Sequence, residues 1–186
     1  MLVAQDFTSD QTLAARGIAQ LAPGGGTALW DAVAFAADKL AARPESQPVA
    51  RVLVVISDGE DNSSSVSLQQ AIWVAQRGEV AIYTVSTKEG SNGEYSPLLG
   101  NRALKTLSEQ TGGAIFTPGT LGGLNRSLAD LQQALRGRYM VYYKPASSKP
   151  DGRYHAVDIK AAKDGHKLKV YARKGYYASA LLDAGI

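Results

Sequence analysis

The chain has 186 residues, of which 45% are hydrophobic and 20% are charged, and these values are typical of a globular domain with a small appendage. It contains no cysteine, which excludes disulfides, thiolate nucleophiles and cysteine-bound zinc, and no apolar run reaches the ~20 residues of a membrane-spanning helix. The net charge of +3 conceals an asymmetry, because residues 1–100 contain 6 basic and 11 acidic residues, whereas residues 101–186 contain 14 and 6.

Apolar periodicity predicts a series of helices along the chain. Leu13, Ile18 and Leu21 indicate a first helix, for which Thr8 and Gln11 have the spacing of a capping box. The same rules predict four more helices: Leu29–Leu40, which ends before Arg43-Pro44; a helix from the Ser67–Gln70 capping box to Gly78; residues 101–111; and Leu121–Leu135.

Three predicted strands lie between these helices, at residues 51–57, 79–85 and 113–117. They are continuously apolar rather than alternating, as expected for parallel strands covered by helices on both faces. We therefore predict a three-layer α/β fold. Ligands of such sheets bind beyond the carboxyl ends of the strands, and the oxygen-rich segment "SDGEDNSSS", residues 57–65, follows the first predicted strand.

The pattern changes after Arg136. Asp164-Gly165 is a turn signal between strand-like segments, so we predict a small antiparallel β appendage and divide the chain into residues 1–136 and 137–186. This basic part could bind an acidic partner, but its lysines recur at strand-like spacing, which favours a solvated face, and we infer no nucleic-acid binding. The strand-like segments are "RYMVYYKP" (138–145), "RYHAVDIKA" (153–161) and "KLKVYARKGYY" (167–177).

Two loops contain candidate ligands, "PGGGTALWDA" at residues 23–32 and "SDGEDNSSS". The first lacks both common phosphate-binding patterns, and Thr27 by itself is more simply an N-cap residue. In the second, Asp58 by itself could be a turn residue. An EF-hand is excluded because Ser63 stands where the sixth loop position needs glycine. A nucleophile elbow is excluded because Val55 stands where that motif needs glycine.

Taken together, the two loops resemble the von Willebrand factor A (vWA) domain, which has a Rossmann-like fold. The resemblance runs from about Val3 to Leu135, and the tail resembles a bacterial vWA-related branch. It implies a metal-ion-dependent adhesion site with Thr27 and Asp58 as ligands of Mg²⁺, Mn²⁺ or Ca²⁺. Supporting positions would be Ser57, Gly26, Gly59, Glu60 and Asp61. The segments that carry the resemblance are "VAQDFTSD", "GGGTALWDAVAFA", "VLVVISDGEDNSS" and "LKTLSEQTGGAIF".

The chain departs from the family at the first metal motif, D-x-S-x-S, which belongs at the end of the family's first strand. Met1–Phe7 matches the third strand instead, so we expect an N-terminally truncated sheet. Asp61–Ser65 fits the motif as a string, but we interpret that match as a coincidence because it lies inside the loop of the third motif.

The truncation has two expected consequences. The strand at Val52–Ile56 should lack a neighbour and favour self-association through an exposed sheet edge. The metal should bind weakly, because Mg²⁺ prefers six oxygen ligands and the chain supplies few. Without metal, we expect Asp58, Glu60 and Asp61 to repel one another.

The function implied by the resemblance is metal-dependent binding of a protein ligand that supplies a carboxylate, without enzymatic activity, nucleic-acid binding or membrane insertion. The resemblance also favours an extracytoplasmic location. Two alternatives remain open from the sequence. One is a metal-dependent hydrolase, although neither His155 nor His166 is placed as a base. The other is a metal-independent interaction module that uses the basic C-terminal strands.

Overall fold

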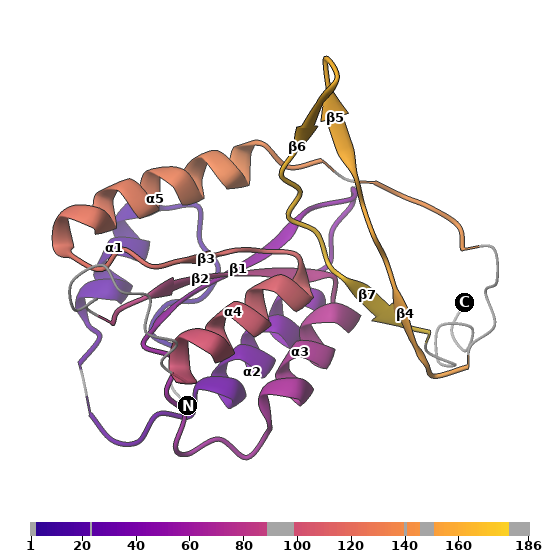
Figure 1. The fold of residues 1–186 in the computed structure, drawn as a ribbon. Coiled ribbons are helices and arrows are strands. Elements are labelled where there is room, and N and C mark those ends of the chain that lie inside the picture. The colour runs from indigo at the N-terminus through magenta and orange to yellow at the C-terminus, as the bar shows by residue number, and fades with distance from the viewer. Residues whose placement is uncertain (1–2, 23, 89–98, 140, 146–150, 179–186) are drawn as a thin grey trace.

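A computed structural model describes residues 3–22, 24–88, 99–139, 141–145 and 151–178. Its centre is a parallel sheet of order β1-β2-β3, formed by β1 (Arg51–Ser57), β2 (Val80–Ser86) and β3 (Ile115–Phe116). Figure 1 shows the sheet between two layers of helices. One layer consists of α2 (Leu29–Ala41), α3 (Leu68–Arg77) and α4 (Leu99–Thr111), and the other is α5 (Leu121–Arg136). The predicted three-layer α/β fold is therefore confirmed.

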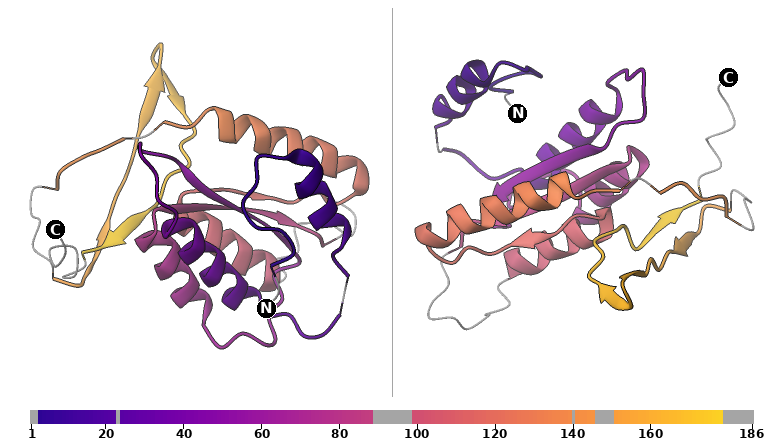
Figure 2. Two further views of the ribbon diagram at one scale, coloured as in Figure 1. Left: turned by 180° about the vertical axis from the view of Figure 1, so that it is seen from behind. Right: turned by 90° about the horizontal axis from the view of Figure 1, so that it is seen from above.

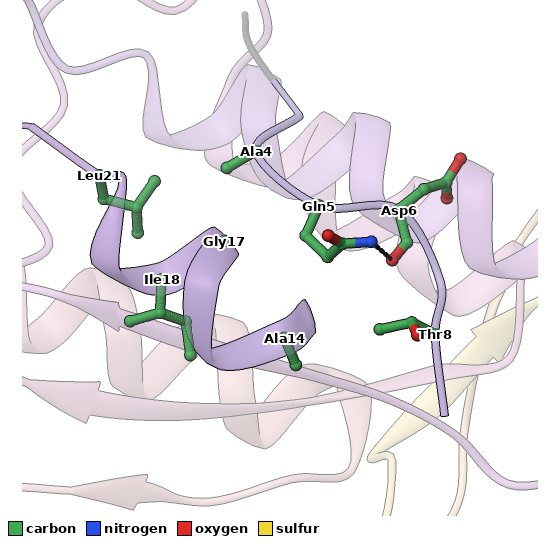
Figure 3. A pocket seen from close by; sticks show the side chains of 8 residues that line it. All are labelled: Ala4, Gln5, Asp6, Thr8, Ala14, Gly17, Ile18 and Leu21. Carbon is green, nitrogen blue, oxygen red and sulfur yellow. Dashed lines mark hydrogen bonds between the residues drawn. The ribbon is translucent and has the colours of Figure 1, made fainter. Parts of the chain in front are cut away.

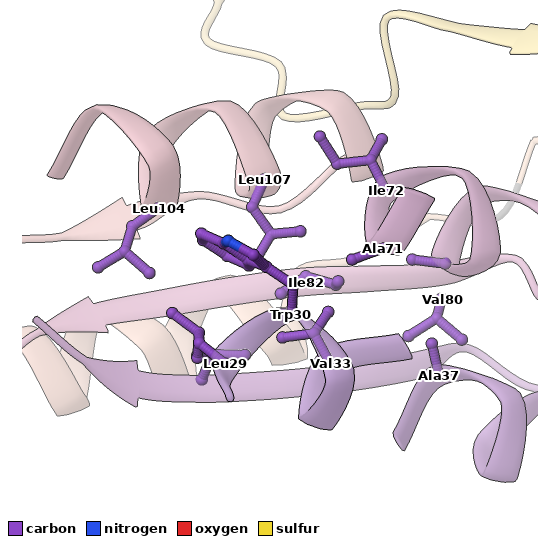
Figure 4. Packing of buried hydrophobic residues seen from close by; sticks show 12 residues of the cluster. Leu29, Trp30, Val33, Ala37, Ala71, Ile72, Val80, Ile82, Leu104 and Leu107 are labelled. Atoms are coloured by element: carbon purple, nitrogen blue, oxygen red, sulfur yellow. The ribbon is translucent and has the colours of Figure 1, made fainter. Parts of the chain in front are cut away.

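Strand β2 joins the two hydrophobic cores of the domain. Its residues Val80 and Ile82 pack with α2, α3 and α4, whereas Ala81, Tyr83 and Val85 pack towards α5. Because both faces are covered, every residue of the strand is buried, which explains its continuously apolar sequence. Figure 4 shows the larger core, in which Trp30 and Leu29 of α2 lie against Ile82 and against Leu104 and Leu107 of α4.

Strand β1 is paired on one side only, with β2, in the part of the chain that the structure describes. Val55 is buried, but Val54 and Ile56, which point to the opposite face, are 38% and 61% exposed. The expected open apolar edge is therefore present among the described residues.

The helix termini follow the predictions in part. Ser67 and Gln70 form the predicted capping box at the start of α3, and Gly78 ends that helix. The capping box predicted at Thr8 and Gln11 is wrong. The helix α1 (Gln11–Ala19) begins one residue after Asp10, whose carboxylate accepts hydrogen bonds from the amides of Thr12 and Leu13.

The N-terminal segment packs against α1 rather than joining the sheet. Figure 2 shows that α1 stands apart from both helical layers. A shallow pocket of about 410 Å³ lies between the helix and the preceding segment, and Figure 3 shows the side chains that line it. A Cβ at Gly17 would lie 2.6 Å from the Cβ of Gln5, so this contact requires glycine. The strand predicted at Met1–Phe7 is not found: residues 3–7 form no strand, because no described strand lies beside them to pair, and residues 1–2 lie outside the described residues.

The C-terminal part contains a two-stranded ribbon with an irregular middle. Its root pairs β4 (Tyr154–Ala156) with β7 (Gly175–Tyr177), and its tip pairs β5 (Ala161–Lys163) with β6 (His166–Leu168). Both pairs are antiparallel, as predicted. Asp164 and Gly165 form the turn, with φ of 50° and 78°, as a two-residue hairpin loop requires. The strand predicted at 138–145 is not found: residues 138–139 and 141–145 form no strand, and Tyr139 and Val141 are exposed.

No helix among the described residues is long and apolar enough to cross a membrane.

Candidate functional site

The candidate site lies where the chain leaves β1 and turns. Asp58 follows the last residue of the strand, and its Oδ1 accepts a hydrogen bond of 3.0 Å from the amide of Glu60. The hydroxyl of Ser57 accepts another, also 3.0 Å long, from the amide of Gly59. Gly59 has φ of +78°, and a Cβ there would lie 2.3 Å from the carbonyl oxygen of Gly100. The turn therefore needs glycine both for its backbone conformation and for its close approach to α4.

The rest of this loop caps helix α2. The helix N-cap, Ala28, has no side chain that can cap. Instead, Asp61 Oδ1 accepts a hydrogen bond of 2.7 Å from the amide of Leu29, and Ser64 Oγ accepts bonds of 3.0 and 3.1 Å from the amides of Trp30 and Asp31. These amides belong to the first helical turn and have no partner within the helix. The cap is thus supplied by residues more than thirty positions away in the chain.

Helix α2 and the residues before it also form hydrogen bonds with the backbone and side chains of the loop. The Asp31 carboxylate accepts hydrogen bonds from the amides of Ser65 and Val66, at 2.9–3.1 Å. Thr27 donates its amide to Asn62 Oδ1 at 2.8 Å, while its carbonyl accepts from the amide of Asn62 at 3.0 Å. We call this set of reciprocal bonds between residues 27–31 and 61–66 the clamp.

The clamp explains why glycine precedes Thr27. A Cβ at Gly26 would lie 2.1 Å from Ser63 Oγ and 3.0 Å from Asn62 Oδ1. The two loops that contain candidate ligands are therefore in direct contact, and Gly26 allows their close approach. The N-cap interpretation of Thr27 is wrong, since Ala28 is the N-cap and the capping side chains come from Asp61 and Ser64.

The acidic residues of the loop have different environments. Glu60 forms an ion pair with Lys88, which follows β2. Partial burial raises the pKa of the Asp61 carboxyl, but hydrogen bonds from Ser64, Leu29 and Trp30 outweigh this effect, so its pKa lies below its ordinary value. The expected mutual repulsion is therefore wrong for Glu60 and Asp61, whose charges are compensated. Among the described residues, Asp58 is the one carboxylate of residues 57–66 with neither a lysine nor a helix N-terminus beside it.

Sequence reasoning missed the structural residues Asp31, Asn62 and Ser64. It did flag Asp61–Ser65 as a string that fits D-x-S-x-S by coincidence. In the structure Asp61 and Ser64 of this string cap α2, which gives the string a structural role. The signal available in the sequence was the run of Asp, Asn and Ser residues, which are the common capping residues. Nothing in that run indicates which helix it caps.

The donor types at this edge fit a hard divalent cation, but few donors are present. Within the described ranges, no group of three or more His, Asp or Glu side chains could hold a metal ion. Thr27 and Asp58 supply one hydroxyl and one carboxylate, with the Ser57 hydroxyl nearby in sequence. Because Mg²⁺ takes six oxygens in near-octahedral geometry, water would fill most positions around an ion bound here.

The clamp makes a testable prediction. Replacing Asp61 with alanine should lower the free energy of unfolding by about 1 kcal/mol, as for loss of an N-cap. Glu60→Ala also removes one carboxylate from the loop but breaks only an exposed ion pair, and should cost a few tenths of a kcal/mol. Urea denaturation of both variants measures the difference.

The effect of Asp61 should also depend on pH. Because its folded pKa lies below its unfolded value, its stabilisation is fully present above about pH 4 and is lost as the pH falls through the folded pKa. The stability difference between wild type and Asp61→Ala should therefore narrow in acid. Equal losses for the two variants, or a difference that does not change down to about pH 3, would contradict the clamp.

The sequence was compared with curated proteins and the fold with solved structures. No curated protein matches the sequence. One similar solved chain is described as "Crystal Structure of Uncharacterized Membrane Spanning Protein from Vibrio fischeri". It is 19% identical, the match covers 69% of this chain and 67% of that chain, and the TM-score is 0.40.

The family comparison is more informative. The model of the von Willebrand factor type A domain matches residues 4–122, a range that contains both loops of the clamp and all three strands of the parallel sheet. The Rossmann-like α/β fold of that family agrees with the three-layer architecture described above. The chain therefore belongs to the von Willebrand factor type A domain family.

Proposed function

We propose that this chain is a divalent-metal-dependent module that binds a protein ligand at the carboxyl ends of β1 and β2. Domains of this family generally mediate metal-dependent protein interactions and are typically not enzymes. The finer proposal names Thr27 and Asp58 as the metal ligands. Ser57, Gly26, Gly59, Glu60 and Asp61 would support them.

One observation carries the proposal: the clamp uses the capping residues around Thr27 and Asp58 but leaves these two side chains out of the cap. The helix amides are bonded to Asp61 and Ser64, and Thr27 takes part through its backbone. Asp58 has only the short turn contact with Glu60 among the contacts described above. The hydroxyl of Thr27 and the carboxylate of Asp58 thus remain available to a ligand, at an edge of the sheet that the hydrogen bonds of the clamp hold in place.

A bound Mg²⁺ or Mn²⁺ would supply a positive charge with an open coordination position for a carboxylate of the partner. The protein's own contribution is to hold Asp58 at the end of a rigid strand, so that its charge offsets part of the cost of dehydrating the ion. Glu60 is paired with Lys88 and Asp61 with α2, so we assign them to supporting the loop rather than to direct coordination.

The hydrolase alternative receives no support from the histidines. His155 stacks on Tyr176 and contacts Asp151 at 3.0 Å, and His166 lies in β6 at the tip of the C-terminal ribbon. Neither residue belongs to the loops that carry Thr27 and Asp58. The proposal therefore assigns no general base to the site.

The metal proposal is tested by thermal unfolding with Mg²⁺, Mn²⁺ or EDTA. Wild type should be stabilised by RT ln(1 + [L]/Kd), or about 1.4 kcal/mol at ten times Kd, which for a weak site requires millimolar ion. Asp58→Asn and Thr27→Val should lose this stabilisation, because each removes a ligand while nearly preserving its shape. In EDTA, Asp58→Asn should be about as stable as wild type, since Glu60 and Asp61 are already compensated.

Glu60→Gln is the matched control for this experiment. It removes one negative charge from the same loop but no proposed ligand, so it should keep the metal-dependent shift. A wild type without any shift, or an equal loss in Glu60→Gln, would refute the assignment of Thr27 and Asp58. Unfolding of Asp58→Asn in EDTA would identify Asp58 as a structural turn residue.

The open edge of β1 supports a second element of the proposal, self-association. A strand edge with unpaired backbone groups and exposed apolar side chains favours pairing with another strand, and Val54 and Ile56 provide such side chains. We propose that copies of this chain associate weakly through β1.

Self-association is tested with Ile56→Lys, because a lysine on an edge strand disfavours strand pairing. Sedimentation velocity over a range of protein concentrations should show wild type associating and the variant sedimenting as a monomer. Ile18→Lys is the control, since Ile18 is 71% exposed on α1, away from β1. A monomeric wild type, or equal dissociation in both variants, would contradict pairing through β1.

A further inference from the structure

Among the described residues, the tip of the C-terminal ribbon carries positive charge that no ion pair neutralises. Residues 153–177 contain seven Lys or Arg and two Asp residues. Two of the lysines are paired, Lys160 with Asp158 and Lys174 with Glu109, each at 3.1 Å. Among the described residues, Lys163, Lys167 and Lys169 pair with no carboxylate. We call these three residues the lysine tip.

The root of the ribbon is anchored, whereas the tip is not. At the root, Lys174 contacts Glu109, and Tyr154 donates a hydrogen bond to Gln110 Oε1 at 3.4 Å, so both bonds reach the end of α4. At the tip, every residue of β5 and β6 is exposed. Figure 1 shows this hairpin projecting from the body of the molecule. A short hairpin without buried side chains is marginally stable by itself, and its lysines, which have like charge, repel one another.

The lysine tip is separate from the proposed metal edge. The root contacts α4 at Glu109 and Gln110, shortly before β3 begins. It therefore lies beside the amino ends of the parallel strands, whereas Thr27 and Asp58 lie at their carboxyl ends. A ligand of the tip would not need the metal.

We propose that the lysine tip binds an acidic polypeptide segment. Its three ammonium groups are complementary to the carboxylates of an acidic chain, whose negative charges would reduce the repulsion among them. Leu168, which is 51% exposed, adds apolar contact area on the same segment. This inference does not rest on the metal site.

Two observations favour an acidic polypeptide over a nucleic acid. Single-stranded nucleic acids bind proteins by stacking bases on aromatic rings, but Tyr171, the one Phe, Tyr or Trp between residues 158 and 173, has the Lys169 ammonium over it at 4.9 Å. The charges of the tip are also lysines, without the planar guanidinium fork that suits phosphate. Lysine ammonium groups are sufficient for carboxylates.

The experiment measures binding of a fluorescently labelled oligo-glutamate peptide to the full chain in EDTA. Wild type should bind it with an affinity that falls as salt is added. The triple variant Lys163→Gln, Lys167→Gln, Lys169→Gln should bind the peptide at least about tenfold more weakly. This factor corresponds to the summed binding free energy of three exposed charge contacts. The corresponding triple lysine-to-arginine variant keeps the charge and should retain binding.

A matched control removes three positive charges elsewhere. Arg16→Gln, Arg102→Gln, Arg126→Gln changes exposed residues of α1, α4 and α5 and should keep the peptide affinity within about twofold. No binding by wild type, or an equal loss in the two glutamine variants, would overturn the proposal. Tighter binding of an oligonucleotide of the same charge, or of anionic lipid vesicles, would overturn the choice of an acidic polypeptide.

Discussion

The reciprocal hydrogen bonds between the start of α2 and the loop after β1 are the interaction on which the site depends. Helix α2 begins at a residue pair, Ala28-Leu29, that cannot cap it, and the loop after β1 leaves the sheet without a strand to pair with. Each segment provides hydrogen-bond partners for the unpaired amides of the other. Asp61 and Ser64 accept hydrogen bonds from the helix amides, and Asp31 accepts hydrogen bonds from the loop amides. Because an unpaired amide near the core costs about 1–3 kcal/mol, neither segment is expected to keep its conformation when the other is removed. The position of Thr27 relative to Asp58 follows from this interdependence.

The clamp is effective because it connects two parts of the core that are rigid for other reasons. Trp30 and Val33 hold α2 against β2 and its neighbours, while Val55 holds β1 to the same core. The turn at Asp58 is also fixed from the side of α4, by the close packing of Gly59 against Gly100. An edge fixed in this way would need little reorganisation on binding a ligand, which would reduce the entropy lost.

The sequence correctly predicted the elements that depend on a local pattern of residues. It did not predict the features that depend on contacts between distant parts of the chain. Continuous apolar runs correctly predicted the parallel strands, because β2 is buried on both faces, and the Ser67–Gln70 box correctly predicted the start of α3. Thr8–Gln11 was assigned by spacing alone, yet Asp10 lies directly before the helix and caps it. The cap of α2 could not be predicted, since Asp61 and Ser64 lie more than thirty residues beyond the amides that they bind. The strand predicted at 138–145 failed for the same reason, because a strand-like run of residues does not show whether a partner strand is available.

The central claim is that a divalent cation binds between Thr27 and Asp58, and the most direct measurement is paramagnetic broadening by Mn²⁺ of amide signals in a ¹H–¹⁵N spectrum of the whole chain. Substoichiometric Mn²⁺ should first broaden the amides of Thr27 and of residues 58–60, and excess Mg²⁺ should restore them. Asp151 and His155, which lie 3.0 Å apart in the C-terminal part, provide an internal comparison. Broadening centred on that pair, or spread evenly over the exposed carboxylates without any preference for Asp58, would contradict the account.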